Sequence, residues 1–149
     1  RILYEFDNRP CGEVYAEVLG VSADEIKDYF VSNPLGIVIG DEIFVRTFDQ
    51  IKDGGITLHC GLPEGAEINV LKIGDIVADT KQALDNIITY QPAGVINFNC
   101  LYRTFEMLNK DLTQPYCALF GRYPSIGFST GGEAFLGHIN ETSTVLIIK

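Results

Sequence analysis

The spacing of apolar residues changes along the chain, and each change predicts a different element. Residues 2–6 alternate between apolar and mixed positions, which predicts a strand. Apolar residues then recur at helical spacing through 14–19, and Gly20 fits the position that follows a helix C-terminus. Ser22 and Glu25 have the spacing of a capping box, so we expect a second helix to begin there.

From residue 36 onward the apolar residues come in short β-branched or aromatic runs. Turn sequences separate them, among them Gly40-Asp41 and Asp53-Gly54-Gly55. Such short connections favour an antiparallel meander, because a parallel pair of strands needs a crossover of about a dozen residues or more. The four predicted strands are residues 36–39, 43–48, 57–60 and 68–73.

The second half of the chain alternates predicted helices and strands. Asp75 or Asp79 can cap a helix that runs to residue 88 with its apolar residues on one face. The other predicted elements are a strand at 93–98, a helix at 100–112 ended by Pro115, and closing strands at 126–130 and 145–148. This order predicts a single-domain α+β fold over residues 1–149, an α/β sandwich in which an antiparallel sheet is flanked by helices.

Composition and charge narrow the classes of partner. The chain has 149 residues, of which 46% are hydrophobic and 21% charged, as in a globular domain. Its formal net charge is -9, and no run of basic residues occurs. Nucleic acids and anionic membrane surfaces bind clustered Lys and Arg, so neither is expected as a partner. No stretch approaches the roughly 20 apolar residues of a membrane helix, so we expect no membrane contact by this segment.

Four cysteines are widely spaced and form no C-x-x-C pair. Together with the absence of a signal-peptide pattern, this favours reduced thiols and a cytoplasmic location. The chain begins and ends inside strand-like runs, so we expect it to be part of a longer protein.

Two sets of residues resemble catalytic nucleophiles, and each also has a purely structural interpretation. The G-x-S-x-G pattern around Ser129 matches a hydrolase nucleophile elbow, but glycines follow where that motif needs a helix. Cys100 and His138 can form a nucleophile pair only if the fold brings them together. The Cys and His residues lack zinc-site spacing, so neither a metal nor a cofactor is predicted. We expect no enzyme, and a Ser or Cys hydrolase is the weakest alternative.

The junction at residues 97–103 places the end of a strand directly before a helix. Asn99 is suited to cap that helix, whose free N–H groups attract anions. Arg103 falls in the first turn, where a cation opposes the helix dipole. It therefore needs an acidic partner, and both Glu133 and a carboxylate ligand qualify.

Three stretches also carry a family resemblance. They are the opening residues 4–20, the junction 96–103 with Cys100 and Arg103, and the closing run 126–144. In this order they resemble the C-terminal half of the FIST sensory module (F-box and intracellular signal transduction proteins). One departure is Gly131, where the family usually carries a Tyr; if that Tyr lines the ligand site, the pocket is altered or enlarged there.

The resemblance implies an intracellular sensory domain of a signal-transduction protein that binds a small ligand, an amino acid or related carboxylate. It also implies a FIST N-terminal domain and an output domain as partners in the full-length chain. The alternative is a protein-interaction or scaffold module without a small ligand. The predicted ligand-binding residues are Asn99, Cys100, Arg103, Ser129, Glu133, His138 and Asn140.

Overall fold

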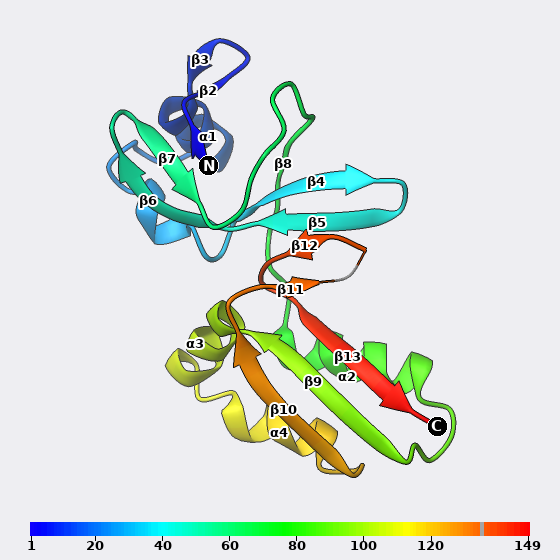
Figure 1. Cartoon of the computed structure of the whole chain (residues 1–149). Helices are drawn as coiled ribbons and strands as arrows, with labels where there is room; N and C mark the ends of the chain where they lie inside the picture. Colours follow the sequence, from blue (N-terminus) through cyan, green and yellow to red (C-terminus); the bar gives the residue numbers. More distant parts are fainter. Residues whose placement is uncertain (135) are drawn as a thin grey trace. The chain divides into compact units, whose positions relative to one another are not determined.

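The computed structural model describes residues 1–134 and 136–149, and it divides into two compact units, residues 1–73 and 74–149 (Figure 1). Both units combine helices with antiparallel strand pairs, which confirms the predicted α+β fold. Among the described residues, no helix has the length and apolar character needed to cross a membrane.

The first unit has the predicted short antiparallel strands, but they belong to two sheets and do not form one meander. Its strands form two three-stranded sheets, ordered β1-β7-β6 and β5-β4-β8, with β2 and β3 as a separate pair. The elements are β1 (Ile2–Leu3), β2 (Glu5–Phe6), β3 (Arg9–Pro10), α1 (Cys11–Leu19), η1 (Ile26–Tyr29), β4 (Leu35–Ile39), β5 (Glu42–Arg46), β6 (Phe48–Lys52), β7 (Gly55–Leu58) and β8 (Asn69–Val70). Gly20 ends α1 in the left-handed conformation, with φ of 72°, as its position predicted.

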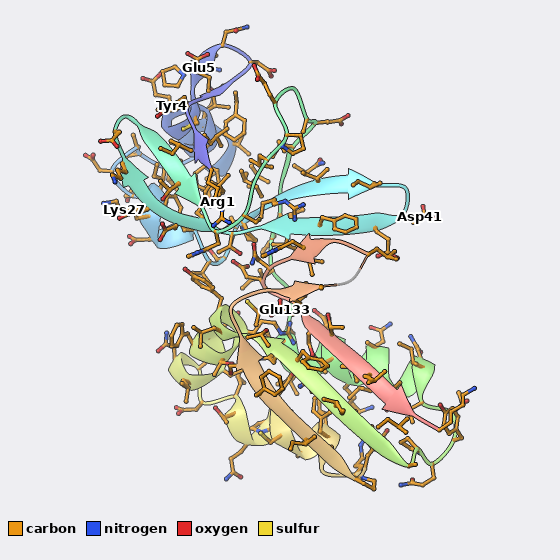
Figure 2. All side chains as sticks on the ribbon, viewed as in Figure 1. Arg1, Tyr4, Glu5, Lys27, Asp41 and Glu133 are labelled. Carbon is orange, nitrogen blue, oxygen red and sulfur yellow. The ribbon has the colours of Figure 1, made fainter. Side chains whose placement is uncertain are left out.

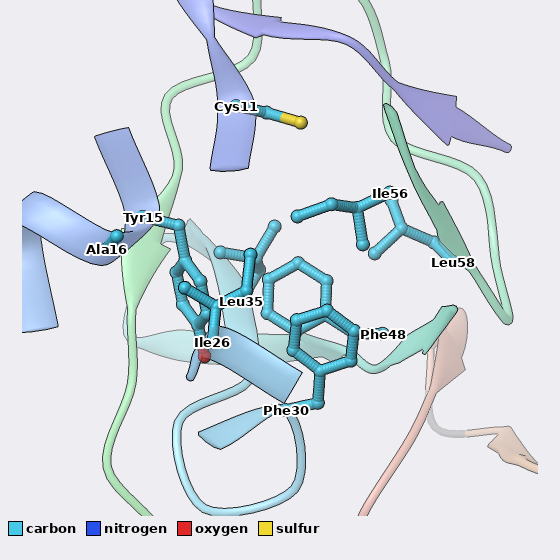
Figure 3. Close-up of a cluster of buried hydrophobic side chains, with 9 residues drawn as sticks. All are labelled: Cys11, Tyr15, Ala16, Ile26, Phe30, Leu35, Phe48, Ile56 and Leu58. Carbon is cyan, nitrogen blue, oxygen red and sulfur yellow. The ribbon is translucent and has the colours of Figure 1, made fainter. Parts of the chain in front are cut away.

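The second helix expected in this unit is only one 3-10 turn, η1. The capping contact itself forms, because the Ser22 hydroxyl donates to Glu25 at 2.6 Å. The apolar side chains that follow turn into the core (Figure 3). There Phe30 stacks on Phe48 with ring centroids 4.5 Å apart, and the hydroxyl of Tyr15 donates to the Asn33 carbonyl at 2.8 Å.

The second unit is built on a three-stranded sheet of order β10-β9-β13, with β11 and β12 as a separate antiparallel pair. Its elements are α2 (Ile76–Ile87), β9 (Gly94–Cys100), α3 (Leu101–Asn109), α4 (Thr113–Phe120), β10 (Ser125–Thr130), β11 (Glu133–Ala134), β12 (His138–Ile139) and β13 (Ser143–Ile148). Strand β13 is antiparallel to β9, whereas β10 is parallel to it. Helices α3 and α4 supply the crossover that a parallel pair requires.

The helix predicted at 100–112 is α3, which ends at Asn109, and the sequence did not predict the helix α4 that begins at Thr113. Pro115 lies in the first turn of α4, where its missing N–H leaves no helical hydrogen bond unmade. Leu101, Phe105, Leu108 and Leu112 recur at helical spacing, which predicts that they form the apolar face of the helix expected at 100–112. That prediction was wrong, since Phe105 and Leu108 are exposed while Met107 is buried. The predicted capping role of Asn99 was also wrong, because Cys100 is the N-cap residue and makes no side-chain cap.

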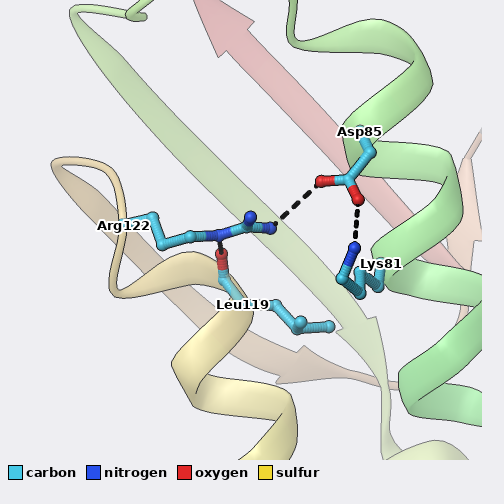
Figure 4. Close-up of polar contacts among 4 residues, drawn as sticks. All are labelled: Lys81, Asp85, Leu119 and Arg122. Atoms are coloured by element: carbon cyan, nitrogen blue, oxygen red, sulfur yellow. Dashed lines mark hydrogen bonds and ion pairs between the residues drawn. The ribbon is translucent and has the colours of Figure 1, made fainter.

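Helix α2 forms as its sequence predicts. The Asp75 carboxylate accepts hydrogen bonds from the N–H groups of Val77 and Ala78, both at 2.9 Å. Near the other end of the helix, Asp85 pairs with Lys81 and with the guanidinium of Arg122, the latter at 3.4 Å (Figure 4). These contacts tie α2 to the segment that follows α4.

The two faces of the β10-β9-β13 sheet differ. Alternate residues of β9, namely Val95, Asn97 and Asn99, are buried on the side that carries α2 and α4 (Figure 1). Carbon-rich side chains, aromatic rings among them, stand on the opposite face (Figure 2). The exposed apolar residues of this face include Ile126, Phe128, Leu146 and Ile148.

Candidate ligand-binding site

A cavity of about 490 Å³ lies within the second unit, between α2 and β13. Helix α2 lines it with Thr80, Leu84 and Ile87, which the helical period of 3.6 places on one face. Strand β13 lines it with alternate residues, including Ser143 and Ile147, because side chains two apart share a face. The volume falls within the range of small-molecule sites.

Arg103 reaches this cavity from α3 and is held by neutral partners. Its Nε donates to Asn99 Oδ1 and its Nη2 donates to Thr80 Oγ1, both at 3.0 Å. The guanidinium carbon lies 5.8 Å from the centre of the Tyr116 ring, within cation–π range. The side chain is therefore fixed from both sides, by the sheet and by α2.

The charge of Arg103 has no carboxylate partner in residues 1–134 and 136–149. No Asp or Glu there lies within 4.0 Å of the guanidinium, so the alternative of a bridge to Glu133 is not formed. A guanidinium has five N–H donors, of which these two hydrogen bonds occupy two. Paired donors in a fixed fork match the two oxygens of a carboxylate.

Beneath Arg103 lies a buried network of amides and hydroxyls. The Tyr116 hydroxyl accepts from Asn97 Nδ2 at 3.0 Å and lies 3.1 Å from Asn99 Oδ1, to which it donates. The Ser143 hydroxyl donates to Asn97 Oδ1 at 2.7 Å. Asn99, at the end of β9, is thus oriented by Tyr116 of α4 and by Thr104 of α3, and its side-chain amide oxygen accepts the hydrogen bond from Arg103.

Glu133 occupies a separate buried position on β11. It is only 4% exposed, and its carboxylate accepts hydrogen bonds from the hydroxyls of Thr130 and Thr142, the latter at 3.0 Å. Thr142 also belongs to the cavity lining. Glu133 therefore supports a wall of the cavity through Thr142, and its place on β11 is marked in Figure 2.

Ser129 and His138 lie on different strands and have different partners. Ser129 Oγ is 2.7 Å from Thr104 Oγ1, and His138 Nε2 is 3.2 Å from Nδ2 of the buried Asn140. Gly132 packs against this pair, since a Cβ there would lie 2.7 Å from His138 Nε2. A Cβ at Gly131 would meet no atom within 4 Å, so a side chain can begin at this position without a clash.

The two nucleophile arrangements weighed from the sequence lack the features they need. Strand β10, which carries Ser129, is followed by β11, whereas a nucleophile elbow leads into a helix. Cys100 is 1% exposed, and burial raises the pKa of its thiol, with the charge of Glu133 acting in the same direction. A protonated thiol is a much poorer nucleophile than a thiolate.

The structure thus unites part of the predicted site. Arg103 lines the cavity, and Asn99 holds the Arg103 side chain in place. The strand ends around β11 and β12 carry the other predicted residues Ser129, Glu133, His138 and Asn140. Sequence reasoning missed Thr80 and Ser143, which face the cavity beside Arg103. A usable signal was present, because Thr80 is a polar residue on the otherwise apolar face of a predicted amphipathic helix.

Comparison with known families gives one match. The family model described as the FIST C domain matches residues 12–136, well over half of the chain. No curated protein and no solved structure matches it.

Proposed function

We propose that this chain, which belongs to the FIST C domain family of sensory domains in signalling proteins, binds a small carboxylate in the cavity between α2 and β13. The observation that carries the proposal is Arg103, whose charge lines the cavity and is held there by neutral hydrogen-bond partners. Binding a carboxylate neutralises that charge with paired hydrogen bonds.

Amino acids belong to the proposed ligand class. The carboxylates of Asp79 and Glu141 line the same cavity as Arg103, so an ammonium group has acidic side chains within the site. The hydroxyls of Thr80 and Ser143 add hydrogen-bonding groups near the guanidinium. Glu133, which the sequence also predicts as a ligand-binding residue, supports the cavity wall through its hydrogen bond with Thr142.

The proposal includes a cellular setting. We place the chain in a cytoplasmic signalling protein, with a FIST N-terminal domain and an output domain as its partners. We propose no catalysis. Fluorophosphonate and iodoacetamide probes test this directly: fast, selective labelling of Ser129 or Cys100 in the native protein would instead support a hydrolase.

An interaction module remains the second candidate. The apolar sheet face formed in part by Ile126 and Phe128 favours it, because soluble domains seldom expose large contiguous apolar patches. The two candidates differ in their response to small molecules. Only a ligand-binding domain gains stability from a carboxylate that binds its native state.

The test is a thermal-shift screen of amino acids and small carboxylates against three proteins. They are the wild type, Arg103→Met, which keeps an unbranched side chain but removes the guanidinium and its charge, and the control Arg122→Met. Arg122 belongs to the same unit, but its guanidinium contacts Asp85 and the Leu119 carbonyl (Figure 4). A saturable shift in the wild type and the control that disappears in Arg103→Met supports the proposal. An equal shift in all three proteins refutes it, and no shift in any protein favours the interaction module.

A further inference from the structure

We infer that the cavity selects a carboxylate with an unbranched apolar tail, held head first at Arg103 with its tail between α2 and β13. The inference rests on the proposed function and narrows its ligand class. It follows from how polar and apolar residues are distributed along the two walls.

The α2 wall changes from polar to apolar along the helix. Thr80, which accepts a hydrogen bond from Arg103, is followed on the same face by Leu84 and Ile87 at positions i+4 and i+7. At 1.5 Å per residue, this face extends roughly 10 Å from the hydroxyl of Thr80 to the side chain of Ile87. Ile87 is 63% exposed, so its apolar surface is available to a ligand.

The β13 wall shows the same change. Ser143 is followed by Val145 and Ile147, which share its face and line the cavity. These three residues pair with Asn99, Asn97 and Val95 of β9, so they lie on the side of the sheet that carries the helices.

Arg103 shows that the polar ends of the two walls lie together. Its guanidinium bonds Thr80 on α2 and Asn99 on β9, and Asn99 is the register partner of Ser143 on β13. Both walls therefore begin at Arg103 and become apolar in the same direction. Asp79 and Glu141 also line the cavity, so it is Arg103 that places a carboxylate head at the polar end. The apolar end of the two walls then complements a hydrocarbon tail.

A small residue occupies the path proposed for the tail. Ala83 lines the cavity one helical turn beyond Thr80, among larger apolar neighbours. Ala83→Leu should fill part of the tail channel and leave Arg103 in place. A matched control is Ala78→Leu, the same substitution at an exposed position of α2 outside the cavity lining.

The experiment measures dissociation constants for propionate, butyrate, hexanoate and octanoate, with hexanol as a ligand that lacks the charged head. We expect affinity to rise about fourfold for each methylene buried in the wild type and in Ala78→Leu. Ala83→Leu should lose this gain for the longer acids and keep its affinity for propionate. Arg103→Met should weaken all four acids by a similar factor, and hexanol should bind much more weakly than hexanoate.

Three outcomes separate this inference from the proposed function. If short carboxylates bind through Arg103 but affinity is flat with tail length, the inference is overturned and the proposed function stands. A gain with tail length that persists unchanged in Ala83→Leu overturns the placement of the tail. If no carboxylate of any length binds and the amino acids also give no shift, the proposed function itself is refuted.

Discussion

Removing one buried hydroxyl should weaken the second unit, because several side chains around the cavity depend on it. Tyr116 is 5% exposed, and its hydroxyl joins Asn97 Nδ2 and Asn99 Oδ1 at 3.0 and 3.1 Å. Tyr116→Phe keeps the ring that packs against Phe120 and under Arg103. It therefore removes hydrogen bonds with little change in packing volume.

The expected loss follows from the groups that the substitution leaves without partners. Asn99 Oδ1 still accepts from Arg103, but Asn97 Nδ2 loses the hydrogen-bond acceptor that the structure gives it. A buried polar group left unsatisfied costs about 1–3 kcal/mol. We expect a loss of about 2 kcal/mol, which lowers the melting temperature by roughly 8–16 °C for a cooperative unit of 60–100 residues.

The assay compares Tyr116→Phe with Tyr123→Phe by thermal melting and by hydrogen exchange. Tyr123 packs partly buried against the same core, and its hydroxyl makes no hydrogen bond with residues 1–134 or 136–149. The control should shift the melting temperature little, and only Tyr116→Phe should increase exchange in β9 and α4. Equal effects of the two variants, or a wild-type melting curve for Tyr116→Phe, would refute the reasoning. Because Asn99 positions Arg103, carboxylate affinity should also fall, but by less than in Arg103→Met.

Three further predictions concern the cysteines and one glycine. Iodoacetamide should label the exposed Cys117 rapidly in the native protein and the buried Cys100 only after unfolding, as mass spectrometry of the labelled peptides can show. Burial raises the pKa of the Cys100 thiol, so the folded chain keeps a proton that the unfolded chain releases above about pH 8.5. That contribution to stability is present below this pH and is lost as the pH rises through the folded pKa. The melting temperature should therefore fall less steeply with pH in Cys100→Ala than in the wild type. Identical slopes for the two proteins would contradict this prediction. Gly132→Ala should lower the free energy of unfolding, measured by urea titration, by about 1–3 kcal/mol, because φ is 141° and the new Cβ would crowd His138. Gly131→Ala should change the free energy of unfolding little in the same measurement.

The sequence predicted elements well where the signal is local. Helix α2 begins where Asp75 caps it, because capping depends on groups only two and three residues apart. The apolar face of α3 was misassigned for the opposite reason. Its pattern of Leu101, Phe105 and Leu108 has helical spacing, but only tertiary packing decides that the face with Met107 is the buried one.

The candidate site, too, was predictable from the sequence only where local signals sufficed. The position of Arg103 in the first turn of a helix singled it out from the sequence as a candidate site residue. The sequence did not indicate its neighbours, because Thr80 lies 23 residues away on α2 and meets Arg103 only when both elements pack on the sheet. The hydroxyl donors to Glu133 are closer in the chain, three residues before it at Thr130 and nine residues after it at Thr142, but no pattern in the sequence marked them as its partners.

The different surroundings of the Glu133 and Arg103 charges give the strongest reason to expect an anionic ligand. Glu133 is buried with hydroxyl donors, which satisfy a carboxylate through hydrogen bonds. Arg103 is held by an amide oxygen and a hydroxyl, which fix its orientation without neutralising it. A positive charge near the start of a helix is unfavourable by about 0.3–1 kcal/mol, so a rigidly positioned arginine there has a cost to stability. A carboxylate entering the cavity offsets that cost and meets a guanidinium that is already oriented, so little side-chain entropy is lost on binding.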